Sequence, residues 1–146
     1  MCLHNSIAVA EQTILLMLAV YKRIIEGYNR VISGKWHGNR HGMNQFILHG
    51  KNIGVIGLGN IGSKVASLAS AFGMKVFYYD IDRRYDLESR YGFQYTELTE
   101  LYKTSDIISL HLHLNDETRH LISSKEISFM KKEVVLINVS RAELIE

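Results

Sequence analysis

The chain has 146 residues, the length of one domain with a sizeable core, and its 47% hydrophobic and 22% charged residues are ordinary for a globular protein. The formal net charge of +2 comes from scattered basic residues and excludes a nucleic-acid partner. The single cysteine, Cys2, excludes an internal disulfide, and the longest apolar run is too short to cross a membrane, so we expect a cytoplasmic protein.

Residues 6–32 predict one long helix, because apolar residues recur along them at helical spacing. Asn5 or Ser6 can cap this helix. Its middle is apolar nearly all round. That pattern fits burial against a second domain or subunit, or a core helix of this domain alone.

Residues 33–50 predict a loop in which Trp36 is the one large apolar anchor. His37 and His41 stand four residues apart, a spacing that binds a metal only on a helix. The glycines of this segment argue against a helix, so we expect no metal site. A loop of this length more plausibly packs against a partner.

The stretch KNIGVIGLGNIG, residues 51–62, indicates a function most clearly. An apolar strand runs into the motif G-x-G-x-x-G, formed by Gly57, Gly59 and Gly62, and a helix and a second strand follow. In that context Gly57 permits a tight turn, Gly59 lets a pyrophosphate approach the backbone, and Gly62 lets the helix pack closely on the strand. The helix N-terminus then attracts the phosphates, so the whole unit predicts a dinucleotide-binding site.

Asp80 ends the second strand, where its carboxylate can accept hydrogen bonds from the hydroxyls of an adenosine ribose. Because this carboxylate would repel a 2′-phosphate, we expect NAD rather than NADP. Arg83 and Arg84 follow and could bind a 2′-phosphate, although solvated charges on a loop are the simpler interpretation.

Two helices carry clear end signals. The helix after the glycines is expected over residues 63–72, with Gly73 as its C-terminal stop. Its apolar residues are spaced to face the sheet: Ile61, Val65, Leu68 and Phe72. Ser123 and Glu126 form a capping box that starts another helix.

Strands and helices alternate through the rest of the chain, which predicts an α/β fold, a Rossmann-type doubly wound parallel sheet in a single domain. Asp80, residues 111–113 and residues 138–141 all follow strands, so we expect them in one crevice near Gly57. Arg141 is the natural receptor for a carboxylate substrate, or else a surface arginine that caps the sheet.

Hydride transfer from an alcohol also needs a general base, usually a histidine held by a carboxylate. The candidates are His111, His113 and His120. None has an obvious carboxylate partner by spacing, so none is assigned.

Five segments together resemble the nucleotide-binding domain of the D-isomer-specific 2-hydroxyacid dehydrogenases. They are VAE at 9–11, GKW at 34–36, GKNIGVIGLGNIG at 50–62, SLHLHLNDETRHLI at 109–122 and NVSR at 138–141. The resemblance implies hydride transfer between NAD and a D-2-hydroxy acid or 2-keto acid. It also implies a homodimer formed through the long helix and the Trp36 loop.

The resemblance makes Arg141 the catalytic arginine that orients the 2-keto acid, and it implies cofactor contacts for eight further residues besides the glycines. These are Asn60 and Ile61 at the pyrophosphate, Asp80 at the adenosine ribose, Leu112, His113 and Thr118 on the adenine and ribose side, and Val139 and Ser140 near the nicotinamide.

The chain departs from the family pattern at His113 and Asp116, where proline is usual, and at Ala142, where glycine is usual. The family's catalytic glutamate and histidine and its substrate domain have no counterpart here. We therefore expect an NAD-binding domain of an oxidoreductase that is incomplete as an enzyme on its own. The alternative is a non-catalytic, NAD(H)-sensing dimerisation module of corepressor type.

Overall fold

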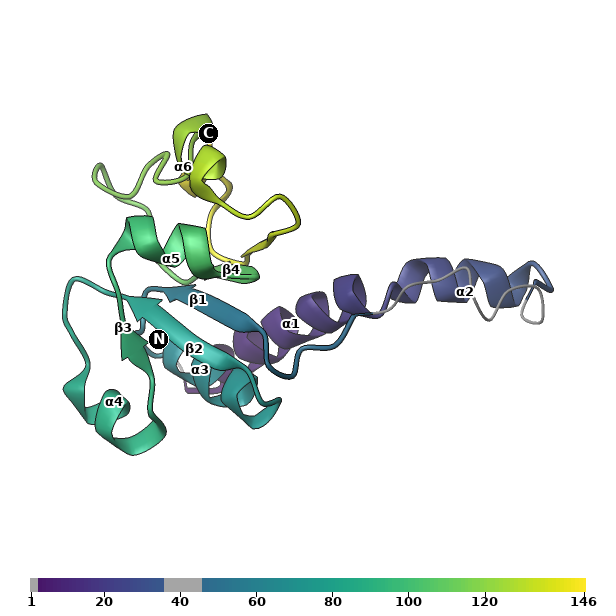
Figure 1. Ribbon diagram of the computed structural model, residues 1–146, viewed down its shortest axis with the longest axis horizontal. Helices are drawn as coiled ribbons and strands as arrows, with labels where there is room; N and C mark the ends of the chain where they lie inside the picture. Colours follow the sequence, from purple (N-terminus) through teal and green to yellow (C-terminus); the bar gives the residue numbers. More distant parts are fainter. Residues whose placement is uncertain (1–2, 36–45) are drawn as a thin grey trace.

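In the computed structural model, which describes residues 3–35 and 46–146, one parallel sheet has the strand order β3-β2-β1-β4-β5 (Figure 1). The strands are β1 (Asn52–Ile56), β2 (Lys75–Tyr79), β3 (Gln94–Tyr95), β4 (Ile107–Leu110) and β5 (Val135–Asn138). The order reverses between β1 and β4, which are neighbours although two strands separate them in the chain. The prediction of a doubly wound parallel sheet is therefore confirmed.

The helices alternate with these strands. They are α1 (Leu3–Tyr21), α2 (Ile24–Ile32), α3 (Gly62–Ala71), α4 (Tyr85–Tyr91), α5 (Leu98–Thr104) and α6 (Ser124–Phe129), followed by a 3-10 turn, η1 (Ala142–Leu144). Helix α1 begins ahead of the predicted cap at Asn5 or Ser6. Helix α6 begins as predicted, because Ser123 and Glu126 form both hydrogen bonds of a capping box.

Helices cover both faces of the sheet, α1 and α3 on one side and α5 and α6 on the other (Figure 1). Side chains alternate along β1, so Ile53 and Val55 join the core under α1 and α3, whereas Ile56 joins the core under α5. Gly54 faces α5 so closely that a Cβ atom there would overlap the side chain of Leu101. The central strand is thus buried on both faces, as expected for a parallel sheet.

Helix α3 packs on the sheet through small residues rather than large ones. Its buried residues are Gly62, Val65, Ala66 and Ala69, whereas Leu68 and Phe72 are 38% and 41% exposed. The prediction that Leu68 and Phe72 face the sheet is therefore wrong. The helix begins so close to β1 that a Cβ atom on Gly62 would overlap the carbonyl oxygen of Gly57, and large side chains do not fit in that gap. Gly73, at φ +77°, ends the helical segment as predicted.

The single helix predicted over residues 6–32 is wrong, because the chain breaks between α1 and α2. Arg23 adopts a left-handed conformation at the break, with φ 51° and ψ 47°. The carbonyl of Tyr21 accepts a hydrogen bond from the N–H of Phe46 at 2.9 Å instead of from the next helical turn. Lys22 Nζ donates to the Phe46 carbonyl at 2.9 Å. Phe46 thus forms hydrogen bonds with Tyr21 and Lys22 at the end of α1, and α2 begins as a separate helix after the break.

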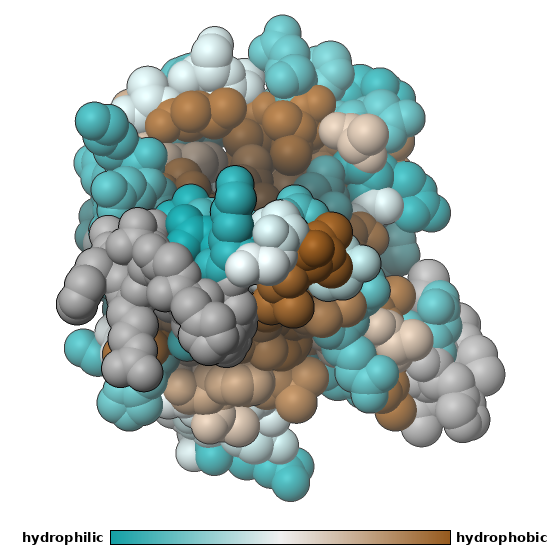
Figure 2. All heavy atoms as spheres, turned by 90° about the vertical axis from the view of Figure 1, so that its right-hand side faces the viewer, coloured by the Kyte–Doolittle hydropathy of each residue, from teal (hydrophilic) through white to brown (hydrophobic). Residues whose placement is uncertain are grey.

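Helix α2 projects away from the sheet (Figure 1) and has no buried residue. Its exposed apolar side chains are Ile24, Ile25, Tyr28, Val31 and Ile32. Figure 2 views the molecule from the end at which α2 projects, and it shows apolar atoms gathered at that end. Within the described ranges, no helix is long and apolar enough to cross a membrane.

Candidate functional site

The glycine-rich loop lies at the carboxyl edge of the sheet, at the point where the strand order reverses. The N–H of Gly57 donates to the carbonyl of Tyr79 at 2.8 Å, which ties the loop to the end of β2. On the other side, the N–H of His111 donates to the carbonyl of Ile56 at 2.8 Å, which continues the ladder between β1 and β4. The structure therefore places the loop at the carboxyl edge of the sheet and at the reversal of the strand order, where the sequence predicted it.

Glycine is found at the three motif positions for different physical reasons. Gly57 has φ +92°, and a Cβ atom there would lie 2.7 Å from the carbonyl oxygen of His111. Gly62 is needed for the approach of α3 to the strand. A Cβ atom on Gly59 would meet nothing within 4 Å, and this residue is exposed. The fold therefore explains Gly57 and Gly62, whereas open space above Gly59 fits a pyrophosphate that approaches the backbone.

Asp80 lies against this loop. Its Oδ2 atom accepts a hydrogen bond from the backbone N–H of Leu58 at 2.6 Å, and Oδ1 accepts one from the N–H of Asp82 at 3.1 Å. The carboxylate is only partly buried. The structure thus brings Asp80 to the glycine loop at the end of β2, the place from which a ribose can be reached.

Asn60 and Ile61 precede the first turn of α3, and the N–H of Ser63 in that turn donates to the carbonyl of Gly59 at 3.0 Å. Asn60 is exposed, whereas the side chain of Ile61 packs against the apolar core. For Ile61, contact with a pyrophosphate therefore falls to the backbone rather than to the side chain. The helix dipole favours an anion at this point.

The segment after β4 curls over the loop. The side chain of Leu112 lies 2.9 Å from the position of a Cβ atom on Gly57. The Thr118 hydroxyl donates to the carbonyl of His113 at 2.7 Å and accepts from the N–H of Asn115 at 2.9 Å. Leu112 therefore lies against the glycine loop, while the hydroxyl of Thr118 shapes the loop that carries the exposed His113.

The turn after β5 is organised by Asn138, a residue that the sequence interpretation placed at the edge without giving it a role. Its Oδ1 atom accepts from the N–H of Ser140 at 3.0 Å, and its Nδ2 group donates to the carbonyl of Arg141 at 2.8 Å. The Ser140 hydroxyl donates to the carbonyl of Leu110 at 3.0 Å, which ties the turn to β4. An asparagine at a strand end is a known turn signal, which would have identified this role.

Arg141 leaves this turn in an extended conformation and is exposed. Its guanidinium donates one hydrogen bond, at 2.8 Å, to the carbonyl of Ser140. The remaining donors face solvent at the edge of the sheet where the glycine loop lies. A guanidinium with free donors can bind a carboxylate through two parallel hydrogen bonds.

Among the histidines that the structure describes, none has the environment of a general base. His111 Nε2 lies 2.8 Å from the Ser109 hydroxyl, its Nδ1 is buried without a partner, and burial lowers its pKa to about 4. Both His113 and His120 are exposed. Within the described part of the chain, no histidine forms an ion pair with a carboxylate.

Within the predicted loop over residues 33–50, the segment 36–45 with Trp36, His37 and His41 lies outside the described residues. Over residues 3–35 and 46–146, no cluster of three or more histidine, cysteine, aspartate and glutamate side chains is arranged to hold a metal ion.

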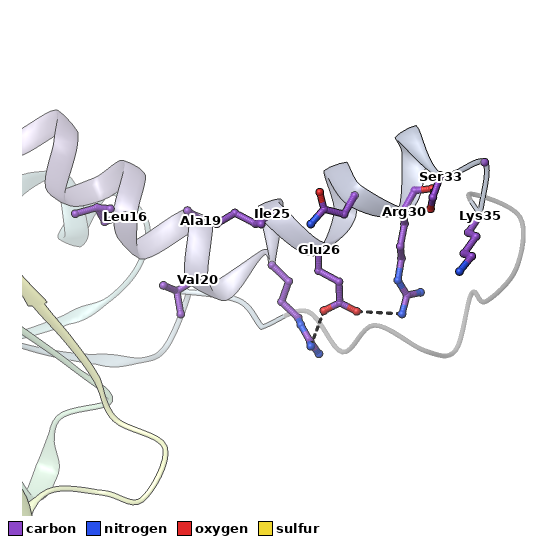
Figure 3. A pocket seen from close by; sticks show the side chains of 11 residues that line it. Leu16, Ala19, Val20, Ile25, Glu26, Arg30, Ser33 and Lys35 are labelled. Carbon is purple, nitrogen blue, oxygen red and sulfur yellow. Dashed lines mark hydrogen bonds and ion pairs between the residues drawn. The ribbon is translucent and has the colours of Figure 1, made fainter.

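A separate hollow runs along the end of α1 and along α2 (Figure 3), where the helices project away from the sheet (Figure 1). Leu16, Val20 and Ile25 supply apolar lining. Glu26 lies between two cations and pairs with both Arg23 and Arg30. This hollow is therefore a feature of the projecting helices and not of the nucleotide crevice.

The chain has clear relatives. Residues 14–146 match the family described as D-isomer specific 2-hydroxyacid dehydrogenase, NAD binding domain. A glyoxylate reductase of Aeropyrum pernix is 40% identical over 95% of this chain, and a hydroxypyruvate reductase of Thermotoga maritima is 39% identical over 95%. These matches cover 43% and 44% of the two relatives, so the chain spans less than half of their length.

A solved structure agrees with this assignment. The D-lactate dehydrogenase of Aquifex aeolicus, complexed with NAD and lactic acid, superimposes with a TM-score of 0.88 and 41% identity. The match covers 94% of this chain and 41% of that enzyme. The resemblance inferred from the sequence, the fold and the prediction of NAD as cofactor are confirmed.

Proposed function

Since the chain belongs to the D-isomer-specific 2-hydroxyacid dehydrogenases, as an NAD-binding domain of that family, we propose that it serves hydride transfer between NAD and a small D-2-hydroxy acid or 2-keto acid. The observation that carries the proposal is the shared edge of the sheet. Asp80, Gly59 and Arg141 follow β2, β1 and β5 at that edge, so a dinucleotide and a carboxylate have receptors along one edge of the sheet. NAD(H), when bound, supplies or accepts the hydride.

Each residue then has a physical task. The backbone at Gly59, Asn60 and Ile61, with Gly57 and Gly62 setting its shape, receives the pyrophosphate. Asp80 binds the adenosine ribose. Leu112, His113 and Thr118 line the adenine and ribose side, and Val139 and Ser140 lie near the nicotinamide.

Arg141 holds the carboxylate of the keto acid and orients its carbonyl carbon toward the incoming hydride. A two-pronged hydrogen bond fixes the plane of the acid as well as its position, so the guanidinium provides orientation besides affinity. The proton for the carbonyl oxygen is not assigned to His111, because its lowered pKa keeps the ring neutral near pH 7.

We also propose a homodimer built on α1 and α2. Helix α2 has no buried residue, and its apolar side chains are 51% to 75% exposed. On the outer face of α1, Leu15 is 58% and Val20 50% exposed. An apolar face of this extent is usually covered by a partner, and a second copy offers the same face by twofold symmetry. The loop over residues 33–50 belongs to the proposal, although Trp36 lies outside the described residues.

The matched relatives named above are dehydrogenases and reductases and do not support the corepressor alternative. A cytoplasmic location is part of the proposal and rests on a composition with one cysteine.

The proposed activity is tested by following the loss of NADH absorbance with glyoxylate, hydroxypyruvate and pyruvate, and with acetaldehyde as a control that lacks the carboxylate. Because the chain spans less than half of the length of these relatives, we expect the keto acids to oxidise NADH only slowly and acetaldehyde not at all. NADH binding without oxidation by any of these acids would contradict the catalytic role and favour a binding module.

A further inference from the structure

Arg84 touches the glycine-rich loop from the side of β2. Its Nη1 group donates to the backbone carbonyl of Leu58 at 3.2 Å. The backbone N–H of Leu58 donates to Asp80 Oδ2 at 2.6 Å. Leu58 is therefore held through both backbone groups, and a guanidinium stands beside the carboxylate that is to bind the ribose. A cation at this place is a potential receptor for the 2′-phosphate of NADP.

Asp86 occupies the binding edge of that guanidinium. Arg84 Nε donates to Asp86 Oδ1 at 3.0 Å, and Nη2 donates to Oδ2 at 2.9 Å. These two parallel donors form the fork with which an arginine grips a phosphate. Because of these hydrogen bonds from Arg84, the pKa of Asp86 lies below its usual value, so the carboxylate stays charged near neutral pH.

The second arginine is engaged elsewhere. Arg83 donates to Glu88 through Nε at 2.8 Å and Nη2 at 3.1 Å. It lies over the rings of Tyr85 and Tyr95. Arg84 is therefore the arginine of this pair that the structure places against the glycine loop.

The charge of the segment that follows β2 also favours NAD over NADP. Residues 80–88 contain four carboxylates and two guanidinium groups, a formal charge of −2. A dianionic 2′-phosphate would enter this field against like charges, whereas a ribose hydroxyl would not. Arg84 can offset that repulsion only if its fork is released.

We propose that Asp86 is a specificity-determining residue, which occupies the fork of Arg84 and thereby makes the site select NAD over NADP. The inference rests on the proposed NAD binding at the glycine loop and adds a second carboxylate to the selection made by Asp80. It gives Arg84 two states: a loop clamp while Asp86 is present, and a phosphate receptor when it is absent.

The test is to titrate the chain with NADH and, separately, NADPH by nicotinamide fluorescence, in the unaltered protein and in Asp86→Ala. We expect Asp86→Ala to bind NADPH about three- to fivefold more tightly, the range set by an exposed ion pair, and NADH within about twofold of the unaltered chain. Asp82→Ala is the matched control, because it removes the same charge from the same segment without releasing Arg84. It is expected to change the NADPH-to-NADH ratio by less than twofold.

The double variant Asp86→Ala/Arg84→Gln decides whether the gain runs through the guanidinium. Loss of the NADPH gain in this variant supports the inference. An unchanged ratio in Asp86→Ala, an equal gain in Asp82→Ala, or a gain that persists without Arg84 would each overturn it. If the unaltered chain bound no NADH, the proposed function itself would fail. If it bound NADH but Asp86→Ala did not change the ratio, only the role of Asp86 would fail.

Discussion

The carboxylate of Asp80 and the backbone N–H of Leu58 are joined by a 2.6 Å hydrogen bond. This bond links the end of β2 to the loop after β1. The residue that we propose binds the ribose is thus positioned by the loop that we propose receives the pyrophosphate. A change at Asp80 is therefore expected to affect both the ribose contact and the shape of the loop.

Substitution by alanine should have different effects at Gly59 and at Gly62, on NADH affinity at the first and on stability at the second. Gly62→Ala places a Cβ atom on the carbonyl oxygen of Gly57 and should lower the free energy of unfolding by about 3 kcal/mol. Gly59→Ala meets no protein atom and should change the free energy of unfolding by less than about 0.5 kcal/mol, while NADH affinity falls about tenfold. Thermal melting and NADH titration of both variants separate the two roles. An unstable Gly59→Ala variant would contradict this division.

His111 predicts a loss of stability on mild acidification. Burial lowers the pKa of His111 to about 4, from 6.5 in an exposed ring. The unfolded chain therefore takes up a proton below about pH 6.5 that the folded chain refuses until about pH 4, so stability falls as the pH drops through this window. The loss from this one group reaches about 3 kcal/mol.

Urea unfolding above about pH 6.5 and near about pH 5 measures this effect. His111→Gln can keep a hydrogen bond to Ser109 but has no titrating ring, so its free energy of unfolding should depend less on pH. An equal dependence on pH in both proteins would assign the effect to other groups.

Arg141 predicts a variant that folds and binds cofactor but loses turnover. The side chain is exposed and bonds only to the carbonyl of Ser140 among the described residues, so Arg141→Gln should leave the melting temperature and NADH affinity nearly unchanged. Reduction of a 2-keto acid should fall at least about a hundredfold, because a charged two-pronged contact is lost. Arg141→Lys keeps the charge without the fork and should lie between. Full activity in Arg141→Gln would place the carboxylate receptor elsewhere.

The apolar face of α2 predicts that one charge disrupts the dimer. Ile25 is 75% exposed, so Ile25→Glu should not disturb the core of the subunit. Sedimentation should show a dimer for the unaltered chain and a monomer for this variant. Ile127→Glu is the matched control, because Ile127 is 50% exposed and lies on α6, across the sheet from α1. A monomeric unaltered chain would remove the dimer from the proposal.

The doubly wound parallel sheet and the place of the glycine loop at its carboxyl edge could be predicted because each depends on local signals. The glycines with Asp80 identify a βαβ unit, and a terminal polar residue such as Asn138 marks a strand end. The capping box of Ser123 and Glu126 is equally local, and α6 begins there. Such signals act within a few residues, so a single sequence contains them.

The features that the sequence did not predict depend on contacts between distant segments. The break after Tyr21 follows from a hydrogen bond with Phe46, across the whole of α2 and the loop after it. Helical spacing could not tell whether α3 presents Leu68 or Ala69 to the sheet, because closeness to β1 decides it. The fork between Arg84 and Asp86 is a matter of side-chain geometry, although both charges are visible in the sequence.

The most direct test of NAD binding at this crevice is a fluorescence titration of the purified chain with NADH, repeated on Asp80→Ala. We expect saturable binding by the unaltered chain and affinity weaker by about thirtyfold in the variant, since charged hydrogen bonds to the ribose are lost. Circular dichroism of the variant checks that its fold is intact. No binding by the unaltered chain, or equal binding by the folded variant, would contradict the account.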